Sequence, residues 1–245
     1  MPINSKRHSL IQCVRVFFVL LAFLAIGACA IYASSRLAGE AEAADATPRV
    51  SVILDAGHGG ADGGAVGVSG VREKDLNLAV ALELARLLRE AGVEVILTRS
   101  EDTLLYGAEG DVPGHRKEND LKARLAVAEA NPDAIFVSIH MNSFSQAKYS
   151  GLQVYYADTE GSRKLALAVQ DAVRTRLQPE NKRVPHAASS AIFLLDKAVG
   201  CSVLIECGFL SNPEECQRLS QKDYQEELCF SIFCGMMEYI NSLEE

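Results

Sequence analysis

Two histidines and two glutamates occupy positions where they could meet in the folded chain and do chemistry together. His58 and His140 come just after short apolar runs of β type, and Glu206 ends another such run. Glu73 lies at the start of a segment with helical spacing. Imidazole nitrogens and carboxylate oxygens bind zinc, and both groups can move protons near neutral pH. These four residues are therefore the candidates for a catalytic site.

Two histidines and one glutamate are a common ligand set for catalytic zinc, with one coordination position left open. Zinc in such a site acidifies water and polarises a carbonyl oxygen, and a second carboxylate then serves as general base. Glu73 and Glu206 supply the two carboxylates, and spacing alone does not assign one role to each. A single His at a strand end is more often a hydrogen-bonded structural residue than a metal ligand. A single Glu at a helix start more often only interacts with the helix dipole. Glu206 resists that interpretation, because an unpaired carboxylate on a buried strand is costly.

The elements that must position these residues alternate between apolar strands and amphipathic helices. Strands are predicted at Val50–Ala56, Val93–Thr98, Ala134–Ile139, Leu152–Ala157, Ala191–Leu195 and Ser202–Glu206. Helices are predicted at Asp75–Glu90, Arg116–Ala130, Ser162–Leu177 and about Tyr224–Ile240. This alternation predicts a single α/β domain with an open, twisted, mostly parallel sheet of about six strands and helices on both faces. Because ligands bind at the carboxyl ends of such strands, the two histidines and Glu206 should meet at one edge.

The first part of the chain has the pattern of an export signal or a membrane anchor. Lys6, Arg7 and Arg15 precede an apolar run from Val16 to Ala33, about the shortest that can cross a ~30 Å hydrocarbon core. We assign residues 1–33 to this signal or anchor segment, 34–47 to a linker and 48–245 to the catalytic domain. Whether the leader is cleaved, retained or lipidated stays open. The catalytic domain is expected to act outside the cytoplasm.

Composition argues against one class of partner and indicates the role of the cysteines. The formal net charge of −8 argues against a nucleic-acid partner, which would favour a basic surface. The cysteines beyond the leader are odd in number and form no CxxC pair, so we interpret them as buried thiols. Strand alternation places Cys207 on the face opposite Glu206.

Five separated blocks of the sequence resemble the signature of the zinc-dependent N-acetylmuramoyl-L-alanine amidases, in the order of that family. The blocks are LDAGHGGADGGA at 54–65, REKDLNL at 72–78, LTR at 97–99, VSIHMN at 137–142 and LIECGFLSN at 204–212. The resemblance implies that His58, Glu73 and His140 hold Zn²⁺ and that Glu206 is the catalytic glutamate. It also implies cleavage of the bond between the lactyl group of N-acetylmuramic acid and L-alanine in peptidoglycan.

Within that family the chain resembles the short spore-cortex or germination-specific amidases of endospore formers, the CwlD type. The leader and the stretch RKENDL at 116–121 carry this finer resemblance. It implies a role in forming the muramic δ-lactam of the cortex, or otherwise in remodelling the cell wall. It also implies a location in the space between forespore and mother-cell membranes. The long helix that covers the site in some cell-division amidases has no obvious counterpart here, which implies either an exposed site or an activating or regulatory protein partner.

Two alternatives remain from the residues themselves. The chain could be another zinc hydrolase, such as an aminopeptidase or a deacetylase, or an inactive peptidoglycan-binding or scaffold protein. Loss of activity should leave no reason to keep a costly buried charge at Glu206, which argues against the inactive protein. Arg99, Ser138 and Asn142 are candidates either for substrate contacts or for structural hydrogen bonds.

Overall fold

The computed structural model describes residues 27–30, 32, 50–107, 110–198 and 200–243. The chain divides into two units, Met1–Pro48 and Arg49–Glu245. Residues 27–30 and 32 of the first unit are helical. The rest of the predicted signal or anchor segment and the whole of the predicted linker lie outside the described residues. Among the described residues, no helix is both long and apolar enough to span a membrane.

The second unit is built on a six-stranded sheet formed by described residues, in the order β2-β1-β3-β6-β4-β5. Its strands are β1 (Ser51–Ala56), β2 (Glu94–Leu97), β3 (Ile135–Asn142), β4 (Gln153–Tyr156), β5 (His186–Ala187) and β6 (Ser202–Phe209). The first four in the spatial order run parallel, and β4 pairs antiparallel with β6. The predicted open, mostly parallel sheet is therefore confirmed.

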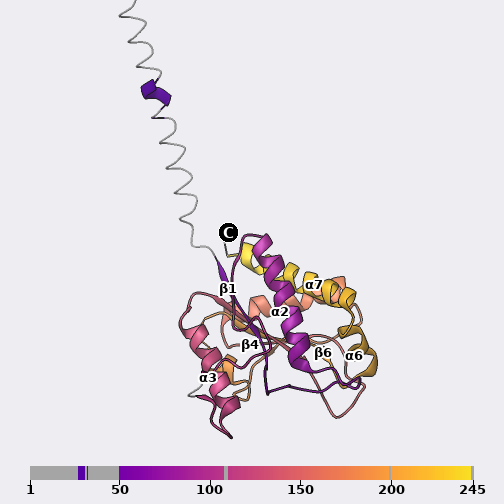
Figure 1. Cartoon of the computed structure of the whole chain (residues 1–245). Coiled ribbons are helices and arrows are strands. Elements are labelled where there is room, and N and C mark those ends of the chain that lie inside the picture. Colours follow the sequence, from indigo (N-terminus) through magenta and orange to yellow (C-terminus); the bar gives the residue numbers. More distant parts are fainter. Residues whose placement is uncertain (1–26, 31, 33–49, 108–109, 199, 244–245) are drawn as a thin grey trace, which may run out of the picture. The chain divides into compact units, whose positions relative to one another are not determined.

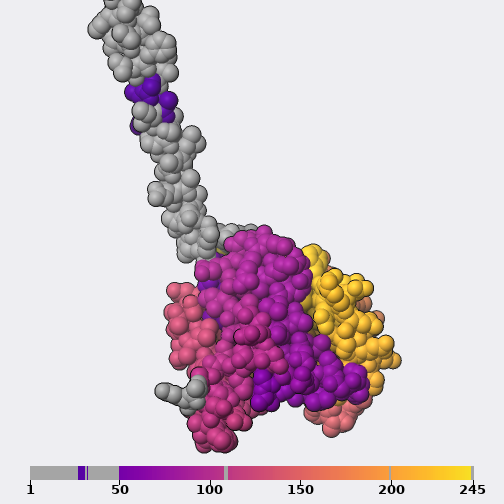
Figure 2. All heavy atoms as spheres, in the orientation of Figure 1, coloured from indigo at the N-terminus to yellow at the C-terminus, as the bar shows by residue number. Residues whose placement is uncertain are grey.

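Helices cover both faces of this sheet (Figure 1). They are α2 (Glu73–Glu90), α3 (Arg116–Glu129), α4 (Glu160–Arg176), α5 (Phe193–Lys197), α6 (Pro213–Leu219) and α7 (Lys222–Asn241). The large core cluster joins α2, α4 and α7 to one face, and α2 and α7 lie side by side in the space-filling view (Figure 2). A smaller cluster joins α3 and α5 to the other face.

Strand alternation divides the sheet residues between the two faces. Val52 and Leu54 belong to the large cluster, whereas Ile53 between them belongs to the smaller one. On β6, Cys207 is fully buried in the large cluster, as its predicted orientation away from Glu206 requires. The described cysteines are all unpaired. Cys207 and Cys229 serve as small hydrophobic side chains of the core.

The strand predicted at Ala191–Leu195 is wrong, because this segment turns into the short helix α5. The Ile192 carbonyl accepts from the Asp196 N–H, and the Leu194 carbonyl accepts from the Ala198 N–H, which is helical bonding. Leu194 and Leu195 are both buried, but they join different clusters. A short apolar run is ambiguous between strand and helix, and here tertiary packing decides. The outermost strand is instead the two-residue β5.

Helix α6 was not predicted, although its start carries a readable signal. The Asn212 side chain accepts hydrogen bonds from the backbone of Glu214 and Glu215, and Pro213 occupies the first turn. An Asn cap followed by Pro is a typical helix start. The helix is too short for periodicity to reveal it.

Helices α4 and α7 approach closely at Gly235. A Cβ atom added there would lie 2.6 Å from the Val169 Cα and 2.7 Å from the Ala168 carbonyl oxygen. Glycine is thus required by the contact between two backbones, although it is a poor helix former.

We expect Gly235→Ala to lower the free energy of unfolding by about 1–3 kcal/mol, since overpacking outweighs the gain in helix propensity of about 1 kcal/mol. Urea unfolding of the two proteins measures the difference. Glu227→Ala, at an exposed position of the same helix, is the matched control and should change stability far less. Equal stability of Gly235→Ala and the wild type would show that the helices can separate without cost.

Candidate metal centre

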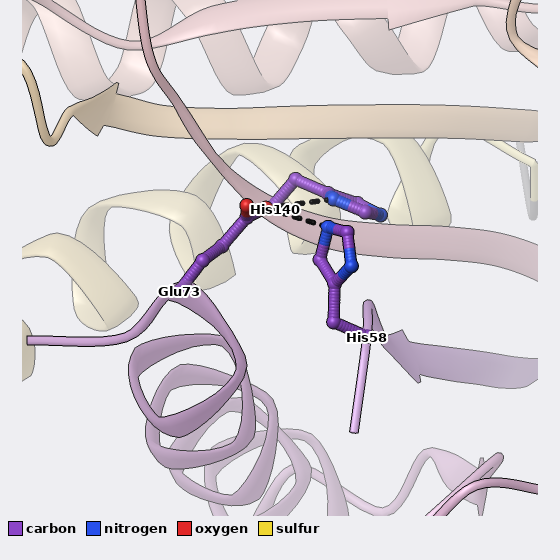
Figure 3. A group of neighbouring side chains, drawn as sticks. All are labelled: His58, Glu73 and His140. Atoms are coloured by element: carbon purple, nitrogen blue, oxygen red, sulfur yellow. Dashed lines mark hydrogen bonds and ion pairs between the residues drawn. The ribbon is translucent and has the colours of Figure 1, made fainter. Parts of the chain in front are cut away.

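His58, Glu73 and His140 meet at the carboxyl edge of the sheet (Figure 3). His140 lies near the end of β3, His58 follows β1, and Glu73 is the first residue of α2. Glu73 Oε1 lies 3.2 Å from His58 Nε2 and 3.0 Å from His140 Nδ1. The candidate ligand atoms of the three residues lie within 4.8 Å of one another. The strand-end argument placed His58 and His140 at this edge, and the family resemblance named Glu73 as the third member of the group.

The backbone around His58 is shaped to let the two imidazoles approach. His58 itself has a φ of +61°, in the left-handed region that a non-glycine residue rarely adopts. A Cβ on Gly57 would lie 2.3 Å from the His140 ring, and a Cβ on Gly64 would lie 2.5 Å from a Glu73 oxygen. The two glycines therefore leave the space that His140 and Glu73 fill.

The second nitrogen of His58 is held by Asp62, a residue that the sequence analysis did not single out. His58 Nδ1 lies 2.8 Å from Asp62 Oδ2. Burial lowers the pKa of His58, but hydrogen bonds to Asp62 and Glu73 outweigh burial and raise it to about 9. The hydrogen bond with His58 lowers the pKa of Asp62 to about 2. A carboxylate on the outer nitrogen fixes the imidazole's orientation, as it does in many metal sites.

The Glu73 carboxylate is ionised, and both of its oxygens accept hydrogen bonds. Burial would raise its pKa, but hydrogen bonds and charge interactions with His140 and His58 bring it well below its usual value. Its Oε1 also accepts from the Met141 N–H at 3.1 Å, and its Oε2 accepts from the Ala65 N–H at 2.8 Å. These contacts orient the carboxylate toward both imidazoles.

Glu206 lies beside this group, but its surroundings raise its pKa, whereas those of Glu73 lower the pKa of Glu73. It is the register partner of His140 across the β3–β6 pair. Its Oε2 is buried and has no hydrogen-bond partner among the described residues. Burial raises the pKa of Glu206 to about 7, with a further contribution from the Glu73 charge. The structure thus distinguishes the two carboxylates that spacing alone left equivalent.

Ser138 and Arg99, which were open between substrate contact and structural bonding, are engaged structurally. Ser138 Oγ donates to Asp55 Oδ2 at 2.6 Å. Arg99 donates to the backbone carbonyls of Ala56, Gly57 and Lys74 and is 3% exposed. Both hold the end of β1 in place.

A cavity of about 250 Å³ opens from the candidate centre toward α3 and α5. His58, His140 and Glu206 line its inner end. The exposed surface of its lining is mainly apolar and includes Leu121 and Phe193, and three charged residues of α3 also line it: Lys117, Asp120 and Arg124. Water or a small acyl group could reach both the imidazoles and the Glu206 carboxylate from this side.

A mostly parallel α/β sheet whose carboxyl edge carries two imidazoles, one ionised carboxylate and one carboxylate with an oxygen unpartnered among the described residues has the arrangement typical of a metallohydrolase. The profile of the N-acetylmuramoyl-L-alanine amidases (Amidase_3) matches residues 52–238. The chain belongs to this family.

Three relatives illustrate the similarity. The germination-specific N-acetylmuramoyl-L-alanine amidase of Bacillus subtilis is 36% identical over 77% of this chain and 78% of its own length. The CwlD amidase of Clostridioides difficile, solved in complex with the GerS lipoprotein, is 38% identical with a TM-score of 0.76, over 79% of this chain and 100% of that chain. AmiC2 of Nostoc punctiforme is 30% identical with a TM-score of 0.67, over 78% and 97%.

We expect Asp62→Asn to weaken Zn²⁺ binding about 10- to 100-fold, because the amide holds the outer nitrogen of His58 less firmly. Competition with a chromophoric chelator measures the affinity. Asp171→Asn on α4, which changes an exposed carboxylate, is the control and should bind as the wild type does. An unchanged affinity in Asp62→Asn would mean that Asp62 does not position His58.

Proposed function

We propose that this chain is a zinc-dependent N-acetylmuramoyl-L-alanine amidase in which His58, Glu73 and His140 hold Zn²⁺ and Glu206 carries the proton. The bond cleaved is the amide between the lactyl group of N-acetylmuramic acid and L-alanine. Residues 48–245 form the catalytic domain, 34–47 the linker and 1–33 the signal or anchor. The observation that carries the assignment is the single Glu73 oxygen within 3.2 Å of a nitrogen from each imidazole.

The residues present fit a zinc ion. Two imidazoles and one ionised carboxylate are a preferred donor set for catalytic zinc. The outer nitrogen of His58 already bonds Asp62, so its inner nitrogen is the one directed at the shared centre. Glu206 has a buried oxygen without a partner among the described residues, and water or substrate at the centre would supply one.

The chemistry of the chain itself centres on Glu206. Zinc, when bound, would polarise the lactyl carbonyl and acidify water. Glu206 accepts a proton from the water that attacks this carbonyl carbon. It then delivers the proton to the alanine nitrogen as the carbon–nitrogen bond breaks. The products are a muramic carboxylate and a peptide with a free amino terminus. A pKa of about 7 suits a group that must take and return a proton near neutral pH.

The biological setting that we propose is maturation of the spore cortex, with δ-lactam formation following peptide removal. The similarity to the Bacillus subtilis germination-specific amidase and to the Clostridioides difficile CwlD amidase supports it. The domain acts outside the cytoplasm, held at or released from the membrane according to the fate of residues 1–33. A regulatory protein partner is proposed because the CwlD amidase was solved with the GerS lipoprotein.

We expect the full-length protein, incubated with purified peptidoglycan, to release new L-alanine amino termini. A chelator should abolish this release and added Zn²⁺ should restore it, since the donor set cannot polarise the carbonyl without its ion. Amino-terminal labelling of the products gives the measurement. Release of acetate without new amino termini would identify a deacetylase, and binding without turnover would support an inactive scaffold.

We expect Glu206→Gln to keep Zn²⁺ while losing about 10²- to 10⁴-fold in kcat, as is typical for removal of a general base. Zinc stoichiometry and turnover are measured on the same preparation. Glu129→Gln, an exposed change on α3, is the control for the loss of a glutamate charge. Loss of zinc with Glu206→Gln would make Glu206 a ligand and overturn the division of roles between the two carboxylates.

A further inference from the structure

A second hollow is separate from the apolar cavity and shares no lining residue with it. It has a volume of about 230 Å³ and is lined by Asn142, Phe144, Tyr149, Tyr155, Arg183 and Phe209. Asn142 ends β3 and Phe209 ends β6, so the hollow lies at the same strand edge as the candidate metal centre. A substrate of the proposed reaction can therefore contact two chemically different hollows near the candidate centre.

Arg183 is the charged residue of this hollow, and it is held close to Glu206. Its Nη1 donates to Gln153 Oε1 at 3.3 Å, and Gln153 is the register partner of Glu206 across the β4–β6 pair. The Cβ atoms of such partners are about 5 Å apart. Burial and the Glu206 charge raise the pKa of Tyr155 while Arg183 lowers it, so the Tyr155 ring lies near both charges.

The Arg183 guanidinium is oriented by contacts that leave part of it free. Its Nε donates to the Ser150 carbonyl at 2.9 Å, and its plane lies over the Phe209 ring at 4.5 Å. The Tyr149 ring is 5.9 Å away. Its Nη2 donates to none of the residues that the structure describes. A guanidinium fixed on aromatic rings with a free terminal nitrogen is well suited to bind a carboxylate.

The positive charge continues beyond Arg183. A neighbouring groove of about 480 Å³ shares Tyr149 and Arg183 with the hollow and adds Lys148, Lys182 and Arg218. None of these four cations forms an ion pair with any described residue. Two acidic residues, Glu180 and Glu215, also line the groove.

The acidic residues neutralise the groove only in part, through the electrostatic interaction of Glu215 with Arg218 and Arg183. Glu215 is 1% exposed, and its two oxygens accept from the Gly151 and Phe209 N–H groups. Glu180 is therefore the only exposed carboxylate in the lining described. Four unpaired cations gathered on one surface of a chain with a net charge of −8 indicate an anionic ligand.

The substrate of the proposed reaction has a matching asymmetry. On the acyl side of the cleaved bond lies an uncharged sugar with its lactyl group. On the amine side lies the stem peptide, whose D-glutamate, diamino acid and terminal residues supply carboxylates. The apolar cavity between α3 and α5 suits the first side, and the cationic hollow suits the second.

We propose that Arg183 is a specificity-determining residue that binds the stem-peptide carboxylate nearest the cleaved bond, and that Lys148, Lys182 and Arg218 form a subsite for the carboxylates farther along the peptide. This inference rests on the proposed amidase function. It gives the enzyme a preference for stem peptides whose second residue keeps a free α-carboxylate.

The test compares two muramoyl tripeptides that are identical except that the second residue has an α-carboxylate or an α-carboxamide. The zinc-loaded full-length protein should cleave the carboxylate form with the higher kcat/KM. Arg183→Gln should reduce the ratio of kcat/KM for the two substrates about 10- to 100-fold, the worth of a hydrogen bond to a charged group. Arg163→Gln, an exposed arginine on α4, should leave this ratio unchanged.

The outcomes separate this inference from the proposed function. Failure of the wild type to cleave either tripeptide would refute the amidase assignment. Cleavage with no preference, or an equal loss on both substrates in Arg183→Gln, would leave the amidase standing and overturn the role of Arg183. Arg183→Gln with unaltered preference but weakened activation by a partner protein would identify the groove as a protein interface instead.

Discussion

The arrangement of the candidate centre depends on one buried guanidinium, that of Arg124. It is 1% exposed and donates to the carboxylates of Asp55 and Asp120 and to the carbonyls of Ala56 and His58. Its hydrogen bonds thus join α3 to the end of β1 and to the loop that follows. Removing one member of such a buried pair costs about 3–5 kcal/mol, because the other charge is left uncompensated. This network can therefore hold His58 in its left-handed conformation, whose strain is about 1–3 kcal/mol.

The two neighbouring glutamates differ because their surroundings differ. Glu73 approaches from α2 and meets imidazoles and backbone N–H groups, which favour its charged form. Glu206 approaches on β6 between buried strands and meets no donor for its Oε2 among the described residues. One carboxylate is therefore suited to hold a cation, and the other to exchange a proton. A pair of titratable groups whose environments move their pKa values apart is what acid–base chemistry at one site requires.

Much of the fold and of the candidate centre could be predicted from the sequence. The periodicities of strands and helices, together with one topological rule, suffice for this. Near-continuous apolar strands alternating with helices predict the parallel sheet, and the carboxyl-edge rule brings His58 and His140 together. The features that were predicted wrongly or missed lie in segments without such regularity. The apolar run at Ala191–Leu195 is too short to separate strand from helix, and tertiary contacts made it α5. Asp62 and Arg183 lie in loops, where only the folded structure reveals their partners.

Strand β6 contributes both to the hydrophobic core and to the candidate site, through neighbouring residues on its two faces. Cys207 faces the core of α2 and α7, while its neighbour Glu206 faces the site. Because alternate side chains point to opposite faces, the strand can be rigidly packed on one side and keep a costly unpaired carboxylate on the other. Rigid packing is what a proton carrier needs, since its distance to the reacting atoms must hold to about 0.5 Å. Glu206 of this strand lines the apolar cavity and Phe209 at its end lines the cationic hollow, so the proposed substrate, if it spans both, would place its cleaved bond near Glu206.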